Sequence, residues 1–180
     1  MRLFFGIEIP PYIKQNILEF QSLLMKAGVK ANWKRVENLH LTLEFLGDYN
    51  EDKVPVLCDV LSEVAKNHKS FKLKIKDLGA FPSFKRPHTL WSGFSGDTEN
   101  LMLLQNELHQ KLLNNNFKLE NRVYKPHLTL ASRPDVRSVG LTDFKNILLG
   151  EFLVDKLILF ESKAENGKRI YTNVCNAGLK

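Results

Sequence analysis

Two short motifs of identical sequence, His-Leu-Thr-Leu, are the part of this chain best suited to chemistry. The first begins at His40 and the second at His127. Because side chains alternate along a β-strand, each histidine shares a face with the threonine two positions later, Thr42 or Thr129, and the leucines occupy the opposite face. Imidazole, with an unperturbed pKa of about 6.5, can donate or accept a proton near neutral pH. Around one pocket, two imidazoles could break a phosphodiester as acid and base, and the hydroxyls could hold its oxygens.

Little in the chain suggests a metal or a cofactor. It contains no HxH, DxD or HExxH motif, so we expect a metal-free site with no cofactor. Glu44 is expected to be the one acid on a His-Thr face, and Ala131 takes its place in the second copy. His68 and His109 fall at polar helix positions and are expected to be solvated. A single His-x-Thr is usually structural, but these two copies occupy matching places in two similar halves of the chain.

The hydrophobic patterns around the motifs predict that each half contains a strand, a helix, the His-Thr strand, a helix and a strand. In the first half these are strand 2–9, helix 13–24, strand 38–47, helix 54–64 and strand 71–81. In the second half they are strand 88–94, helix 101–112, strand 126–132, a shorter helix around 141–149 and strand 151–162. A hairpin turn at 165–168 and a closing strand at 169–177 follow.

This repetition predicts an α+β fold with two lobes related by a pseudo-twofold axis. Mainly antiparallel sheets are expected to flank a central groove, with helices on the outer faces. No linker rich in Pro, Gly or Ser divides the chain. We therefore expect one domain, 1–180, with two internal repeats at about 1–86 and 87–180. The twofold relation would bring the two His-Thr pairs face to face across the groove.

Composition limits the location and the partners. The net charge of +6 permits a polyanionic partner such as RNA. No apolar run approaches the roughly 20 residues of a membrane helix, and the opening "MRLFFGIEIPP" has the pattern of a strand rather than of a secretory signal. Cys58 and Cys175 lie far apart and predict neither a zinc site nor a disulfide framework. A monomer in the reducing cytoplasm is expected.

At its paired motifs the chain resembles the 2H phosphoesterase superfamily, and most closely the RNA 2′,3′-cyclic phosphodiesterases once called 2′-5′ RNA ligases. The resemblance covers nearly the whole chain. It is carried by the opening strand "RLFFGIEIP", the motif segments "WKRVENLHLTLEFLGDYNEDKV" and "YKPHLTLAS", the strand pair "LGAFPSFKRPHTLWSGF" and the closing hairpin "LFESKAENGKRIYTNV".

The resemblance implies metal-free hydrolysis of 2′,3′-cyclic phosphate ends, on RNA or on cyclic nucleotides, to 2′-phosphates. It implies that His40 is the proton donor to the leaving 3′ oxygen and that His127 is the proton acceptor from water. It also implies that Thr42 and Thr129 bind the phosphate. This division of roles rests on the resemblance, because spacing alone does not give it.

One position departs from the family pattern. Family members often carry an arginine directly after the second motif, where this chain has Ser132 followed by Arg133. A one-residue step along a strand reverses the side chain's face. Either a bulge returns Arg133 to the groove to bind phosphate, or another cation, from among Lys125, Arg122 and Lys85, takes that role.

Two other functions fit the same residues. The site could run in reverse and join a 2′,3′-cyclic end to a 5′-hydroxyl, as a 2′-5′ RNA ligase. Alternatively, it could bind RNA ends without turnover, although end binding alone needs no acid and base. A turnover assay separates these alternatives.

Overall fold

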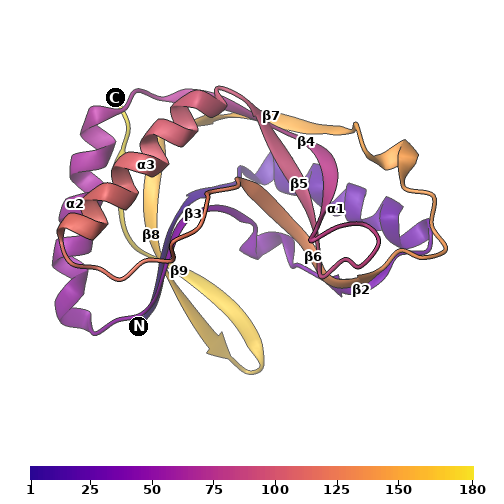
Figure 1. Cartoon of the computed structure of the whole chain (residues 1–180), viewed down its shortest axis with the longest axis horizontal. Helices are drawn as coiled ribbons and strands as arrows, with labels where there is room; N and C mark the ends of the chain where they lie inside the picture. Colours follow the sequence, from indigo (N-terminus) through magenta and orange to yellow (C-terminus); the bar gives the residue numbers. More distant parts are fainter.

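In a computed structural model that describes residues 1–180, the chain forms two antiparallel sheets and three α-helices (Figure 1). The helices are α1 (Pro11–Lys26), α2 (Val54–Asn67) and α3 (Thr98–Asn114). The strands are β1 (Arg2–Glu8), β2 (Lys30–Trp33), β3 (His40–Asp48), β4 (Phe71–Phe81), β5 (Thr89–Gly96), β6 (His127–Asp135), β7 (Leu148–Val154), β8 (Lys156–Glu165) and β9 (Lys168–Gly178). None of the three helices combines the length and apolar composition that crossing a membrane would need.

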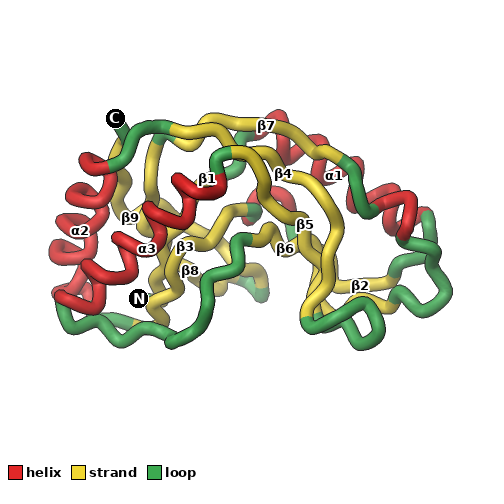
Figure 2. Tube along the Cα trace, turned by 45° about the horizontal axis from the view of Figure 1, so that its top comes forward, coloured by secondary structure: helices red, strands yellow, loops and turns green.

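The two sheets form the two lobes of the predicted α+β fold. The first has the strand order β3-β1-β8-β9, and the second has the order β2-β6-β5-β4-β7. Helices α2 and α3 pack together over the first sheet, and α1 packs on the second (Figures 1 and 2). Figure 2 shows the helices on the outer sides of the molecule, as the sequence predicts. The two His-Thr strands, β3 and β6, contact each other where the lobes meet.

Each half of the sequence contributes strands to both sheets. Strand β4, from the first half, pairs with β5 in the second sheet, and β8, from the second half, pairs with β1 in the first sheet. In the same way, α3 lies over β3, the motif strand of the other half. Because the halves exchange these elements, neither half contains all the strands of either sheet.

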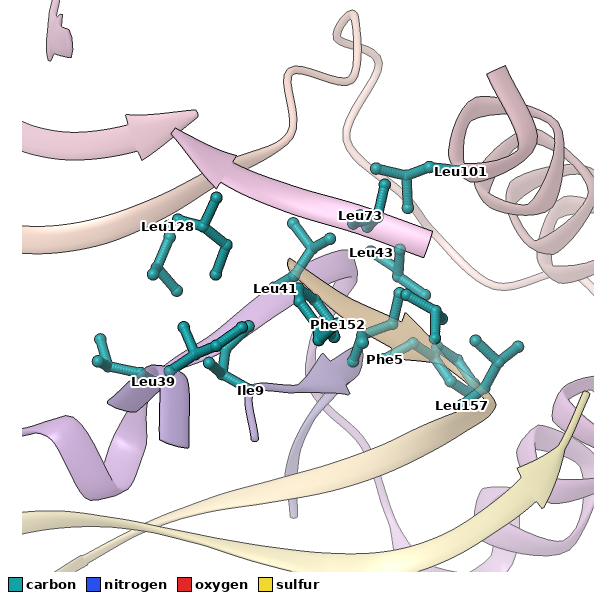
Figure 3. Packing of buried hydrophobic residues seen from close by; sticks show 14 of the residues in the cluster. Phe5, Ile9, Leu39, Leu41, Leu43, Leu73, Leu101, Leu128, Phe152 and Leu157 are labelled. Carbon is teal, nitrogen blue, oxygen red and sulfur yellow. The ribbon is translucent and has the colours of Figure 1, made fainter. Parts of the chain in front are cut away.

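The leucines of both motifs lie in one hydrophobic core, as the alternation predicts. Leu39, Leu41, Leu43, Leu128 and Leu130 are all at most 4% exposed. Figure 3 shows the first four of them with residues from both sheets and from α3. Each fully buried leucine contributes about 1.5–3 kcal/mol. The apolar face therefore fixes both strands, and the histidine face is left free for function.

The predicted helix around 141–149 is wrong. Only Thr142–Phe144 forms a single 3₁₀ turn, and Leu148–Val154 is strand β7, paired with β4. The predicted strand 151–162 is also divided, because β7 belongs to the second sheet and β8 to the first. Strand β2 was not predicted. In each case pairing with a distant strand determines the local structure, and helical spacing of the apolar residues does not.

The two cysteines correct a further prediction. Cys58 of α2 and Cys175 of β9 form a disulfide across 117 residues of sequence. This bond ties the edge strand of the first sheet to the helix that covers it. The expectation that the cysteines form no disulfide is wrong. The cysteines therefore no longer support a reducing compartment.

Candidate active site

The structure brings the four motif side chains together. His40, Thr42, His127 and Thr129 line one groove of about 340 Å³ between the lobes. The remaining lining residues are Lys34, Arg35, Asn38, Leu39, Arg169 and Tyr171. Two imidazoles and two hydroxyls therefore surround one space, as the pseudo-twofold relation predicts.

The His40 ring is held by hydrogen bonds on both nitrogens. Its Nδ1 lies 2.8 Å from the main-chain oxygen of Asn38, and its Nε2 lies 3.1 Å from Oγ1 of Thr42. A carbonyl oxygen only accepts, so Nδ1 carries the hydrogen. In the neutral ring, Nε2 then accepts from the Thr42 hydroxyl. The atom that faces chemistry is therefore Nε2, and Thr42 is its immediate neighbour.

His127 repeats this arrangement in the other lobe. Its Nδ1 lies 2.7 Å from the main-chain oxygen of Lys125, again the residue two positions earlier. The hydrogen is again on Nδ1, and no protein group bonds Nε2. The hydroxyl of Thr129 likewise has no protein partner and is left for a ligand. Both imidazoles are thus fixed in the same tautomer before any substrate binds.

Aromatic rings pack against both imidazoles. Phe4 and Tyr171 lie with ring centroids 4.5 and 4.9 Å from that of His40. Phe81 stands edge-on to His127 at 4.9 Å. Burial lowers the pKa of His40 to about 4; the Asn38 carbonyl opposes this shift, and the charge of Lys14 adds to it. His40 is therefore neutral at pH 7 in the free protein.

The groove is also lined by three cations that were not predicted from the sequence. Lys34 and Arg35 follow β2, and Arg169 lies at the start of β9. The main-chain oxygen of Arg169 accepts a hydrogen bond of 2.8 Å from Asn38, which joins the β8–β9 hairpin to the turn before His40. Lys34 and Arg35 could have been suspected from their closeness to the first motif. Arg169 depends on a distant strand and could not.

Of the two alternatives for Arg133, the structure contains the bulge. Ser132 of β6 pairs with Asn32 of β2, and Asp135 of β6 pairs with Lys30 of β2. The chain therefore advances three residues along β6 but only two along β2 between these pairs, which makes a bulge in β6. Arg133 has a positive φ of 50°, and its side chain is exposed. It is nevertheless not among the residues lining the groove. The bulge alone therefore does not place this guanidinium beside the imidazoles.

A second cavity, of about 480 Å³, adjoins the groove and shares Thr42 and His127 with it. Two of the cations proposed from the sequence, Arg122 and Lys125, line this second cavity. The third, Lys85, lines neither space. The groove and the second cavity meet at Thr42 and His127, whereas His40 lines only the groove.

Glu44 does not share the face of Thr42. Consecutive residues of β1 pair with Glu44 and Thr42, which leaves Leu43 as the extra residue of a bulge. The bulge turns Glu44 toward α3, where its Oε2 accepts hydrogen bonds from Gln105 (3.3 Å) and His109 (2.8 Å). Strict alternation fails here because a bulge adds a residue to one strand only.

The two histidines expected in solvent are paired with carboxylates. His109 bonds Glu44, and His68, directly after α2, lies 2.8 Å from Oε2 of Glu107 in the middle of α3. Nowhere do three or more His, Cys, Asp or Glu side chains gather in a way that could hold a metal ion. These carboxylate pairs are therefore contacts between a helix and its neighbour.

Comparison with known proteins gives consistent results. The sequence model of the family described as LigT like phosphoesterase matches residues 7–91 and 95–171. A protein of Methanocaldococcus jannaschii named RNA 2′,3′-cyclic phosphodiesterase is 32% identical over 95% of this chain and 96% of its own length. One of the same name from Thermotoga maritima is 34% identical over 72% of this chain and 68% of its own. The crystal structure of TT0787 of Thermus thermophilus superposes with a TM-score of 0.83 at 22% identity, covering 99% of this chain and 98% of that one.

Proposed function

Since the chain belongs to the LigT like phosphoesterase family, we propose that it hydrolyses 2′,3′-cyclic phosphate ends of RNA, or cyclic nucleotides, to 2′-phosphates. The names of the relatives from M. jannaschii and T. maritima support this substrate class. The observation that carries the proposal is the matched pair of imidazoles. Each holds its Nδ1 hydrogen against a main-chain carbonyl and presents Nε2 at one groove.

The proposed reaction has two proton transfers, one from water to His127 and one from His40 to the leaving 3′ oxygen. Nε2 of His127 takes a proton from water as the water oxygen attacks phosphorus. The bond from phosphorus to the 3′ oxygen breaks, and that oxygen takes a proton from Nε2 of His40. The 2′-phosphate leaves, and exchange with solvent returns both rings to their starting states. Thr42 and Thr129 donate hydrogen bonds to the non-bridging oxygens and hold phosphorus between the rings.

The low pKa of His40 imposes a condition on its role as the acid. The free ring is neutral at pH 7, because its pKa is about 4. The negative charge of a bound phosphodiester favours the imidazolium and raises that pKa. Binding of the substrate and protonation of His40 are therefore coupled in this proposal. As His40 takes its proton, Nε2 becomes a donor to phosphate, and the Thr42 hydroxyl turns to a phosphate oxygen.

Lys34, Arg35 and Arg169 supply the positive charge along the groove. We assign them the phosphate and backbone contacts of the RNA strand; a phosphate contact by Arg133 is implied only by the family resemblance. No metal and no cofactor is needed, because the imidazoles perform both proton transfers. We propose that the protein acts as a monomer in the cytoplasm.

The deciding experiment uses cytidine 2′,3′-cyclic phosphate and a short RNA with a 2′,3′-cyclic end. The expected product of both is the 2′-phosphate, identified by ³¹P NMR, with no turnover by the His40→Ala/His127→Ala double variant. A 3′-phosphate would show that the other bond breaks. Tight binding without any product would instead favour a module that only recognises RNA ends.

A further inference from the structure

A stack of two aromatic rings lies behind His40. Phe160 packs on Phe4 with ring centroids 5.0 Å apart, and the Phe4 ring lies 4.5 Å from the imidazole. The two rings come from β8 and β1, the strands that follow β3 in the first sheet. The Phe160 ring lies over Gly6 of β1, where an added methyl group would be 3.4 Å from it. A strand position without a side chain therefore makes room for the outer ring.

The second lobe has the same arrangement behind His127. Trp91 packs on Phe81 at 5.0 Å, and Phe81 lies 4.9 Å from the imidazole. These rings come from β5 and β4, the strands that follow β6 in the second sheet. The six-membered ring of Trp91 lies against Gly79, its partner in β4, and leaves no room for a methyl group there. Different residues thus support both imidazoles in the same way.

The two imidazoles do not depend equally on these rings. His40 is also held by a hydrogen bond at Nε2 and by a further aromatic ring. His127 has one protein hydrogen bond, from Nδ1 to the main-chain oxygen of Lys125. An imidazole held by one hydrogen bond can still turn about it, unless a neighbouring ring blocks the motion. The direction of Nε2 of His127 therefore depends on Phe81, and the place of Phe81 depends on Trp91.

Packing alone does not explain why residue 91 is a tryptophan. Nε1 of Trp91 is the one buried side-chain nitrogen or oxygen of the structure without a hydrogen-bond partner. A phenylalanine or leucine would avoid this unpaired donor, which is unfavourable to bury. The indole has a reach that the smaller side chains lack. It extends from Gly79 to the edge of Gly93, the residue of β5 that pairs with His127.

We propose that Trp91 is a positioning residue for the reaction, and that it keeps Nε2 of His127 aimed at the attacking water through Phe81. The inference rests on the proposed function, in which His127 takes the proton from water. Trp91 lines neither the groove nor the second cavity, so it acts on the imidazole and not on the substrate. Phe160 is its counterpart behind His40, where the additional contacts make the outer ring less important.

The first test measures the imidazole without turnover. Long-range ¹H–¹⁵N NMR spectra in alkaline solution show which nitrogen of a neutral imidazole carries the hydrogen. His127 of the wild type should be in the Nδ1–H form, whereas an imidazole free to turn also populates the Nε2–H form. Trp91→Leu should show both forms, and Trp91→Phe, which keeps a ring against Phe81, should restore most of the Nδ1–H form. Phe20→Leu, at a buried aromatic residue of α1 that packs on no imidazole, should match the wild type.

The second test separates kcat from KM, with cytidine 2′,3′-cyclic phosphate as substrate. Trp91→Leu should lower kcat about tenfold, because it misplaces a catalytic group. Its KM should stay within about twofold of the wild type, since no contact to substrate is removed. Phe160→Leu should lower kcat by at most about threefold, since His40 keeps its other contacts. Phe20→Leu should leave kcat unchanged while circular dichroism shows it folded.

A wild-type tautomer and kcat in Trp91→Leu would overturn the proposal, and so would an equal loss of kcat in Phe20→Leu. If Trp91→Leu does not fold, Gly79→Ala replaces it, because the added methyl group displaces the indole without removing it. A purely Nδ1–H imidazole at His127 in Gly79→Ala would then overturn the proposal. If the wild type hydrolyses no cyclic phosphate, the hydrolase function fails, and the tautomer spectra still decide whether Trp91 positions His127.

Discussion

The hydroxyl of Tyr124 donates a hydrogen bond of 2.9 Å to the main-chain oxygen of Thr42. Tyr124 lies three positions before His127, so this bond joins the segment that leads to the second motif to the middle of the first. Burial raises the pKa of Tyr124, and the charge of Glu44 raises it further. The hydroxyl therefore remains a donor throughout the pH range of an assay. It is the direct side-chain link between the two halves of the proposed site.

Tyr124→Phe removes that link and keeps the ring. We expect kcat to fall by roughly tenfold or more, with little change in KM, because small displacements of catalytic groups greatly lower the reaction rate. The unpaired carbonyl of Thr42 should lower the free energy of unfolding by about 1–3 kcal/mol. Steady-state kinetics and urea unfolding measure the two effects. A loss of stability with unchanged kcat would show that Tyr124 supports the fold and does not position the imidazoles.

The cations of the groove can be ranked by a pair of variants. Arg169 lines the groove beside His40, and Arg133 does not line it. Arg169→Ala should raise KM about tenfold by removing a charged contact to substrate, whereas Arg133→Ala should leave KM nearly unchanged. Kinetics with an RNA substrate decide between them. The reverse order would support the prediction from the family resemblance that Arg133 binds phosphate.

Activity should survive an excess of chelator. The two imidazoles can perform both proton transfers, and no cluster of His, Cys, Asp or Glu side chains is placed to hold a metal. Hydrolysis of a cyclic nucleotide is measured before and after dialysis against EDTA, with unchanged kcat as the expected result. Lost activity that a divalent ion restores would contradict a mechanism of two histidines alone.

His40 should make the fold less stable in acid. Its pKa is about 4 in the folded protein, below the value of about 6.5 expected in the unfolded chain. The unfolded state therefore binds more protons between these pH values, and stability rises with pH across that window. The contribution is complete above about pH 6.5 and is lost as pH falls to 4. Between pH 7 and pH 4 it amounts to about 3 kcal/mol.

Comparison of the wild type with His40→Gln isolates this effect, because a glutamine side chain does not titrate. Urea unfolding at several pH values from 4 to 7 should show the wild type losing about 3 kcal/mol more than the variant. Parallel curves for the two proteins would mean that the folded environment of His40 does not disfavour its charge.

Local alternation was enough to predict the motif strands and the core leucines, because strand periodicity is a property of neighbouring residues. What the sequence did not reveal depends on distant pairing. Strand β7 exists because β4 lies beside it, and the bulges at Leu43 and Arg133 appear only against their partner strands. Arg169 reaches the groove because β9 pairs with β8 across the hairpin. Patterns within one segment carry no information on such partners.

His40 and His127 should behave as one acid–base unit. In the working state the pair holds one proton, one ring charged and the other neutral. The pH profile of kcat/KM should therefore be a bell whose limbs report the free protein. One limb should lie near pH 4, where His40 titrates, and the limbs of kcat should be shifted because bound phosphate favours the imidazolium.

Each single change, His40→Ala or His127→Ala, should slow turnover by roughly 10²–10⁴-fold, the usual contribution of one positioned acid or base. The double change should cost much less than the product of the two, since groups that act as a unit are not additive. The leucines on the opposite face should keep all three variants folded, which circular dichroism checks. A single variant that stays folded and keeps near-normal turnover would falsify the two-histidine mechanism. Strictly multiplicative losses would mean that the two rings act in separate steps.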